Sequence, residues 1–215
     1  MRLFIDSADI GEIREAAAMG AIDGVTTNPS LLAKAGKPTR QAIVEICEAM
    51  DGPVSVEVLA TSHTGIVDEG RELHRIHPNV VVKVPLTIDG LKALRTLSRE
   101  HVRTNATLCF SSPQGLLAAK AGATYVSPFI GRLDDLGHEG MELVEQLVNI
   151  WNNYDFTTEI LVASVRHPTQ VVQAALLGAH AATVPFQVIA KLIRHPMTDL
   201  GLARFLEDAR RIPKE

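Results

Sequence analysis

The residue with the clearest chemical potential is Lys83, which stands in the run Val80-Val81-Val82-Lys83-Val84-Pro85. A β-branched run of this kind predicts a strand that is buried on both faces. Burial disfavours the charged form of an amine, and a neutral amine is the nucleophile that Schiff-base chemistry on a carbonyl substrate requires. The alternative is a lysine at the end of a strand whose stem is buried and whose ammonium group reaches solvent.

Other chemically useful side chains recur near the ends of the predicted strands. Carboxylates can move the protons that imine formation needs, arginines offer paired donors to phosphate, and amides and hydroxyls suit sugar hydroxyls. Together with Lys83 they predict carbonyl chemistry on a polyhydroxylated phosphate. The residues concerned are Asp6, Thr26, Asn28, Glu57, Asn105, Thr107, Ser127, Arg132, Ser164 and Arg166.

Each of these residues has a simpler interpretation when it is taken alone. Asp6 could cap the helix that follows it, and Glu57 could be a solvated strand residue, although a carboxylate among valines is costly without a partner. Segment 26–30 could be turn chemistry. Arg132 could form a surface ion pair with the aspartates two and three residues after it. Only their convergence at one end of a fold would favour a reactive site.

The arrangement of the chain predicts such a convergence. Short apolar runs alternate with amphipathic stretches, and this regular alternation favours a single (β/α)8 TIM barrel domain over residues 1–215, with an additional C-terminal helix. An open doubly wound sheet is the alternative, but no glycine-rich dinucleotide or phosphate loop follows a strand. The predicted strands are 3–6, 24–27, 54–59, 80–85, 104–109, 125–129, 160–164 and 182–184. The predicted helices are 9–19, 39–50, 64–76, 90–100, 113–121, 139–151, 169–177, 187–193 and 198–211.

Composition narrows the class of protein. The 215 residues, 46% of them hydrophobic, suffice for one large core, and the net charge of −4 argues against general nucleic-acid binding. Cys47 and Cys109 are expected to be reduced core thiols, and no metal-ligand spacing is present. The sequence shows no secretory signal or membrane-spanning run, so we expect a cytoplasmic enzyme.

Five segments together resemble the transaldolase family, and most closely its small-subunit branch, which includes the fructose-6-phosphate aldolases. They are 24–30 (Gly-Val-Thr-Thr-Asn-Pro-Ser), 82–85 (Val-Lys-Val-Pro), 104–107 (Thr-Asn-Ala-Thr), 127–132 (Ser-Pro-Phe-Ile-Gly-Arg) and 163–166 (Ala-Ser-Val-Arg). The similarity runs in unbroken order from residue 3 to about residue 205. It implies a (β/α)8 barrel that acts on sugar phosphates without a metal or organic cofactor, and a homo-oligomer, a pentamer or a decamer of two pentamers.

The resemblance also implies roles for individual residues. Lys83 matches the Schiff-base lysine, Asp6 the carboxylate that serves the C4 hydroxyl, and Glu57 with Thr107 the pair that holds a proton-relaying water. The positions that match sugar contacts are Asn28, Asn105 and Ser127, and we expect Thr26, at the end of its strand, to bind substrate with them. The positions that match the phosphate site are Arg132, Ser164 and Arg166.

Two positions bear on the type of reaction. The aldolases of this branch typically carry Gln where Glu57 stands and Tyr where Phe129 stands, so this sequence has the transferase residue at both. A tyrosine hydroxyl could organise the water that protonates or hydrolyses a bound intermediate, whereas Phe129 in the substrate site would leave the intermediate waiting for an aldehyde. The resemblance therefore favours a transaldolase, with an aldolase or a non-catalytic sugar-phosphate-binding barrel as the alternatives.

Overall fold

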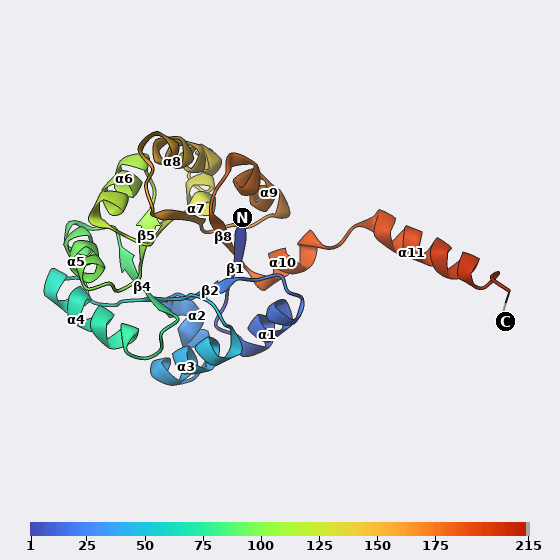
Figure 1. Cartoon of the computed structure of the whole chain (residues 1–215), viewed down its shortest axis with the longest axis horizontal. Helices are drawn as coiled ribbons and strands as arrows, with labels where there is room; N and C mark the ends of the chain where they lie inside the picture. The colour runs from blue at the N-terminus through green and yellow to red at the C-terminus, as the bar shows by residue number, and fades with distance from the viewer. Residues whose placement is uncertain (214–215) are drawn as a thin grey trace.

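The computed structural model describes residues 1–213 and contains a closed barrel of eight parallel strands. Each strand pairs with the next one along the chain, and the last pairs back with the first. Helices form a ring around the barrel (Figure 1). The predicted (β/α)8 architecture is confirmed, and the open doubly wound sheet is wrong. The predicted domain extends to residue 215, and residues 214 and 215 lie outside the described part.

All the predicted strands and helices are present, with ends that differ by at most three residues. The strands are β1 (Arg2–Asp6), β2 (Gly24–Thr26), β3 (Val54–Glu57), β4 (Val80–Pro85), β5 (Thr104–Cys109), β6 (Tyr125–Pro128), β7 (Glu159–Val162) and β8 (Ala181–Val184). The helices are α1 (Ile10–Ala18), α2 (Pro29–Lys34), α3 (Thr39–Ala49), α4 (His63–His74), α5 (Ile88–Arg99), α6 (Ser112–Ala121), α7 (Ile130–Asp134), α8 (Gly140–Tyr154), α9 (Pro168–Leu177), α10 (Phe186–Leu192) and α11 (Pro196–Ala209).

Two short helices, α2 and α7, were not expected from the sequence. Helix α2 has six residues and α7 has five, which is too short for an amphipathic period to be visible. Helix α2 begins at Pro29 inside the segment that could be turn chemistry, with proline in the first turn, where its missing N–H costs nothing. Both helices follow directly on strand ends, so they carry side chains at the mouth of the barrel.

The apolar residues form two separate layers. The larger layer lies between the strands and the surrounding helices, and a smaller cluster fills the barrel interior. Gly24 is required beside this cluster, because a Cβ there would lie 2.9 Å from the Phe4 ring and 2.7 Å from the Pro53 carbonyl oxygen. The interior cluster consists of Phe4, Val81, Tyr125, Leu161 and Ala181.

Helix α11 differs from every other long helix in the described part of the chain because it buries none of its residues. It extends away from the barrel after α10, at the right of Figure 1. Its exposed apolar side chains include Met197, Leu200, Leu202, Phe205 and Leu206. Within residues 1–213, none of the helices has the length and apolar character needed to span a bilayer.

Candidate active site

A cavity of about 550 Å³ opens where the strands end, within the size range of small-molecule sites. In a barrel of parallel strands this end is where active sites form. Nine of the residues expected from the sequence line it, namely Asp6, Thr26, Asn28, Glu57, Lys83, Ser127, Phe129, Arg132 and Ser164. The structure therefore brings most of the predicted site together.

Lys83 is held inside the barrel and does not reach solvent at its rim. Lys83 is 5% exposed, and its Nζ donates a hydrogen bond to the Thr27 carbonyl oxygen at 3.1 Å. Nζ also lies 3.0 Å from Oε2 of Glu57, whose side chain is 17% exposed. The parallel register of β3 and β4 sets Glu57 directly opposite Lys83. The interpretation of Lys83 as a strand-end lysine with a solvated ammonium is therefore wrong.

A second carboxylate, Asp6, lies in the same cavity but belongs to a different network. Its Oδ1 accepts a hydrogen bond from Thr26 Oγ1 at 2.7 Å. Asp6 does not cap α1, because Asp9 accepts from the first backbone N–H groups of that helix. Burial raises the pKa of the Asp6 carboxyl, while the Thr26 hydrogen bond and the positive charge of Lys83 oppose this change and the charge of Glu57 adds to it. A carboxyl with a raised pKa is suited to accept and return a proton.

Asn28 serves both local structure and the cavity. Its Oδ1 caps α2 by accepting from the backbone N–H of Leu31 at 3.0 Å. Capping fixes the side chain against the helix terminus, and Asn28 lines the cavity there. The simpler interpretation of this segment as local capping is therefore compatible with substrate contact.

Behind the cavity wall, a polar layer continues into the barrel. Ser127 Oγ donates to Asn105 Oδ1 at 2.8 Å, and Asn105 Nδ2 donates to Ser55 Oγ at 3.2 Å. Asn105 is fully buried and does not line the cavity itself. Thr107 is also fully buried, and its Oγ1 makes no hydrogen bond within residues 1–213. A buried hydroxyl of this kind can bind a water or a substrate atom.

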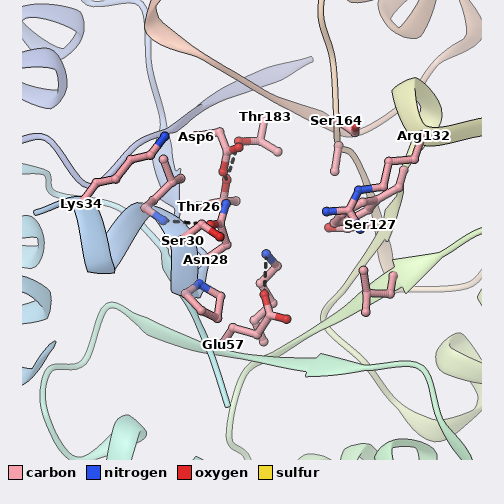
Figure 2. A pocket seen from close by; sticks show the side chains of 16 residues that line it. Asp6, Thr26, Asn28, Ser30, Lys34, Glu57, Ser127, Arg132, Ser164 and Thr183 are labelled. Atoms are coloured by element: carbon pink, nitrogen blue, oxygen red, sulfur yellow. Dashed lines mark hydrogen bonds and ion pairs between the residues drawn. The ribbon is translucent and has the colours of Figure 1, made fainter. Parts of the chain in front are cut away.

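The side of the cavity away from Asp6 carries the positively charged side chain of Arg132 (Figure 2). Arg132 in α7 places its guanidinium 5.1 Å from the centre of the Phe129 ring, and Lys83 Nζ lies 5.9 Å from the same ring. Ser164 lines the cavity beside Arg132 (Figure 2). Gly131 allows this close approach, because a Cβ there would lie 2.2 Å from the Ser164 carbonyl oxygen. Arginine and hydroxyl donors together suit a phosphate.

Arg166 is placed differently from the other predicted phosphate residues. It does not line the cavity, and its guanidinium makes a two-fold ion pair with the Asp135 carboxylate. This pair lowers the pKa of Asp135. Asp134 accepts instead from the backbone N–H of Gly140 and from Gln170. The predicted alternative of a surface ion pair between Arg132 and these aspartates is therefore wrong, since the pair is made by Arg166.

Known proteins resemble this chain along nearly its whole length. Residues 3–214 match the family model described as Transaldolase/Fructose-6-phosphate aldolase. The chain belongs to this family. It is 64% identical over 214 residues to a protein of Sorangium cellulosum (strain So ce56) named probable transaldolase, with 100% of this chain and 99% of that protein covered. Proteins with the same name from Geotalea uraniireducens (strain Rf4) and Thermoanaerobacter sp. (strain X514) are 55% and 54% identical, with at least 98% of each chain covered.

This transaldolase-family enzyme also has cavity residues that sequence reasoning missed. Leu108 lines the cavity because β5 is irregular there, with φ of 58° at Leu108 and a register shift between Ala106 and Cys109. No local sequence signal predicts a left-handed leucine. Thr183 could have been found, since it is the one polar residue in the strand-end run Ala-Ala-Thr-Val. The other missed residues are Pro29, Ser30, Leu31, Lys34 and Ala163.

Metal-ligating side chains do not cluster in the described part of the chain. Within residues 1–213 no group of three or more histidine, cysteine, aspartate or glutamate side chains is placed to hold a metal ion. The cavity instead presents two amines, two carboxylates, amide and hydroxyl groups and one arginine. These groups can carry out acid, base and nucleophilic chemistry on a sugar phosphate.

Proposed function

We propose that this enzyme is a transaldolase that transfers a dihydroxyacetone unit from fructose 6-phosphate or sedoheptulose 7-phosphate to an aldose phosphate. The observation that carries the proposal is the buried Lys83 amine, 3.0 Å from the Glu57 carboxylate in a cavity that also holds Asp6 and Arg132. The amine is a nucleophile for a ketone, and two separate carboxylates allow proton transfers at two different substrate atoms. The acceptors would be glyceraldehyde 3-phosphate and erythrose 4-phosphate.

In the first step Glu57 accepts a proton from Lys83, and the amine attacks the C2 carbonyl of the donor to form a carbinolamine. Glu57 then returns a proton to the C2 hydroxyl, which leaves as water and gives the protonated imine. Thr107, with its unpartnered buried hydroxyl on the next strand, would hold the water that relays this proton. The imine is the electron sink for the next step.

In the second step Asp6 removes the proton of the C4 hydroxyl. The C3–C4 bond breaks, its electron pair moves into the imine, and an aldose phosphate leaves while a three-carbon enamine remains on Lys83. An acceptor aldehyde then reacts with the enamine, Asp6 returns its proton to the new hydroxyl, and hydrolysis releases the product ketose. The raised pKa of Asp6 brings it closer to neutral pH, where a group exchanges protons most effectively.

The remaining residues would bind the substrate. Four residues would contact the hydroxyls of the dihydroxyacetone unit or orient the groups that bind them, namely Thr26, Asn28, Asn105 and Ser127. Arg132 and Ser164 would bind the phosphate. Arg166 would leave its ion pair with Asp135 and bind the phosphate as well. Each phosphate oxygen offers a strong acceptor, so an arginine released from a surface ion pair would find a charge-assisted partner.

Phe129 supports transfer over simple cleavage. Its ring centre lies 5.9 Å from the reactive amine and 5.1 Å from the Arg132 guanidinium, and the ring offers no hydroxyl to hold a water at the enamine. Protonation of the enamine from this side is therefore disfavoured, and the intermediate persists until an aldehyde arrives. The aldolase alternative predicts instead the release of free dihydroxyacetone from fructose 6-phosphate without an acceptor.

Borohydride trapping tests the proposal. Reduction in the presence of fructose 6-phosphate should add the mass of a reduced dihydroxyacetone adduct to the peptide that contains Lys83, and an added acceptor should discharge the adduct. Lys83→Met serves as the control, and it should lose transfer while keeping the fold. A label on another residue, or none, would overturn the mechanism; the absence of any adduct despite sugar-phosphate binding would favour a non-catalytic binding barrel. Rapid release of dihydroxyacetone without acceptor would favour the aldolase.

The proposal extends to assembly and location. An unpacked α11 with five exposed apolar side chains is suited to bury its surface on another copy of the chain, which supports a homo-oligomer, a pentamer or a decamer. The free thiols Cys47 and Cys109 are buried, as is usual in a reducing compartment, which supports a cytoplasmic location. We place residues 1–215 in one domain and expect no contact with nucleic acid or membrane.

Light scattering tests the assembly. The full chain should have the mass of a pentamer or a decamer. A chain ending after Ile193 should form an assembly of fewer subunits, with its helical circular dichroism reduced only by the contribution of α11. A truncated chain that assembles as the full chain does would show that α11 is not part of the interface.

A further inference from the structure

Thr183 is a cavity residue with no role in the mechanism described so far. It lies in β8, is 4% exposed, and its Oγ1 is 2.6 Å from Oγ1 of Thr26. Thr26 in turn donates to Asp6 Oδ1 at 2.7 Å. Figure 2 shows Thr183, Thr26 and Asp6 joined in one line at one side of the cavity, with Arg132 and Ser164 on the other side.

The number of protons fixes the direction of this chain of hydrogen bonds. A threonine hydroxyl has one proton to donate, and an ionised carboxylate only accepts. Thr26 gives its proton to Asp6, so in its bond with Thr183 it must accept. When Asp6 is ionised the order is therefore Thr183 to Thr26 to Asp6. Each bond in such a series strengthens the next one, because accepting a hydrogen bond makes a hydroxyl a better donor.

The barrel holds the three side chains in this order. Asp6 pairs in register with Thr26 on β2, and on its other side β1 pairs with β8, where Thr183 lies opposite Phe4. Side chains two residues apart on a strand share a face, so Asp6 and Thr183 both face into the barrel above the apolar cluster that contains Phe4. The branched Cβ of threonine restricts rotation about the Cα–Cβ bond, which limits where the hydroxyl oxygen can lie.

The charged groups around Asp6 leave Thr26 as its only direct hydrogen-bond donor in the described part of the chain. Lys83 and Glu57 act on Asp6 through their charges, Lys34 lines the same cavity, and neither lysine donates to its oxygens. Since burial disfavours the Asp6 carboxylate, the strength of the Thr26 bond matters for how much carboxylate is present.

We propose that Thr183 is a positioning residue for the proposed aldol cleavage, because it holds the Thr26 hydroxyl on Oδ1 of Asp6, keeps the carboxylate ionised and leaves Oδ2 free for the substrate hydroxyl. The role rests on the proposed function, in which Asp6 is the base. It also implies that β8 contributes to catalysis through two hydrogen bonds without touching the reacting atoms.

The pH dependence of kcat/KM for fructose 6-phosphate cleavage tests this role. We call the rising part of the profile at low pH the acid limb and its level maximum the plateau. In Thr183→Val the acid limb should move to higher pH, so that kcat/KM on that limb falls about threefold while the plateau changes less. Thr183→Ser, which keeps the hydroxyl, should restore the wild-type profile. Thr104→Val is a matched control, since Thr104 is buried in β5, does not line the cavity, and its hydroxyl makes no hydrogen bond within residues 1–213.

A double-mutant cycle separates a chain of bonds from two independent effects. Thr26→Val should shift the acid limb in the same direction and further, and adding Thr183→Val to it should shift the limb no more, because Thr183 acts only through Thr26. A Thr183→Val profile equal to wild type, a serine variant that fails to restore it, or additive shifts in the double variant would each overturn the proposal.

A measurement without turnover keeps the two proposals distinguishable. The Asp6 carboxyl can be titrated by carbon-13 NMR, with its signal assigned from the Asp6→Asn spectrum. Thr183→Val should raise the apparent pKa of that carboxyl whether or not the enzyme transfers a sugar unit. If the titration moves but borohydride traps no adduct in the wild type, the proposed function fails and the hydrogen-bond chain stands. If the adduct forms but the titration does not move, the chain fails alone.

Discussion

Replacing Asp6 by asparagine should stabilise the folded protein near neutral pH while it abolishes catalysis. The burial that raises the pKa of Asp6 means that the fold pays for holding a carboxylate in the cavity. Asparagine keeps Oδ1 as an acceptor for Thr26 and carries no charge, so the penalty disappears and the hydrogen bond remains. The proton transfer at the C4 hydroxyl is lost with the carboxylate.

The pH range in which Asp6 destabilises the fold follows from the direction in which its pKa is shifted. An aspartate in the unfolded chain loses its proton near pH 4, and the folded protein holds it to higher pH because its pKa is raised. The wild-type free energy of unfolding therefore falls as pH rises from about 4 to the folded-state pKa, and stays lowered above it. Each unit by which the folded-state pKa exceeds the unfolded-state pKa is worth about 1.4 kcal/mol, so the variant should gain stability of that order at neutral pH.

Urea unfolding at a series of pH values between about 4 and 8 measures this difference, with protein concentration fixed because assembly adds to apparent stability. The variant and the wild type should converge at the acid end and separate as pH rises. Asp51→Asn, in an exposed loop, reports the effect of removing a surface charge. A variant less stable than wild type at neutral pH, or a difference that does not depend on pH, would refute the reasoning.

Three further predictions follow from individual contacts. Phe129→Tyr should increase the release of free dihydroxyacetone from fructose 6-phosphate without acceptor, measured by a coupled assay, and Phe129→Leu should not; equal release in both would contradict the role of the hydroxyl. Asp135→Asn should free Arg166 for phosphate and lower KM for phosphorylated acceptors a few-fold at nearly constant kcat, with unphosphorylated acceptors as the control; an unchanged KM would remove Arg166 from the phosphate site. Gly24→Ala should lower the free energy of unfolding by about 2 kcal/mol, measured by thermal melting, because its Cβ would lie 2.7 Å from a backbone oxygen; Gly201→Ala, at an open position without a positive φ, controls for the loss of glycine.

The sequence was sufficient to predict the fold because the same pattern of strand followed by helix repeats along the chain. Each strand is a short β-branched or apolar run, and each is followed by a helical segment, so an error at one boundary does not change the alternation. Helices α2 and α7 were missed because six and five residues cannot show a helical period. The polar strand ends then located most of the cavity, since parallel strands in a barrel bring their ends together.

What the sequence could not supply were the choices between competing partners. Arg132 and Arg166 have the same side chain and lie near the same aspartates in the chain, yet Arg166 makes the ion pair and Arg132 faces the cavity. That choice depends on the approach of α7 to the loop after β7, which is a tertiary feature. Thr183 was overlooked for a similar reason, because a threonine in a strand acquires its role only through the neighbours that closure of the barrel gives it.

The barrel interior separates stability from chemistry by two residues along four of its strands, β1, β4, β6 and β8. The apolar residues Phe4, Val81, Tyr125 and Ala181 fill the lower layer, and the residues two positions later are polar and form the upper one. The lower layer is buried and stabilises the barrel through its apolar contacts, while the upper layer holds a paired amine and carboxylate whose desolvation offsets their attraction. Substitutions in the upper layer should therefore change activity more than stability, and those in the lower layer the reverse. The upper-layer partners of the four residues are Asp6, Lys83, Ser127 and Thr183.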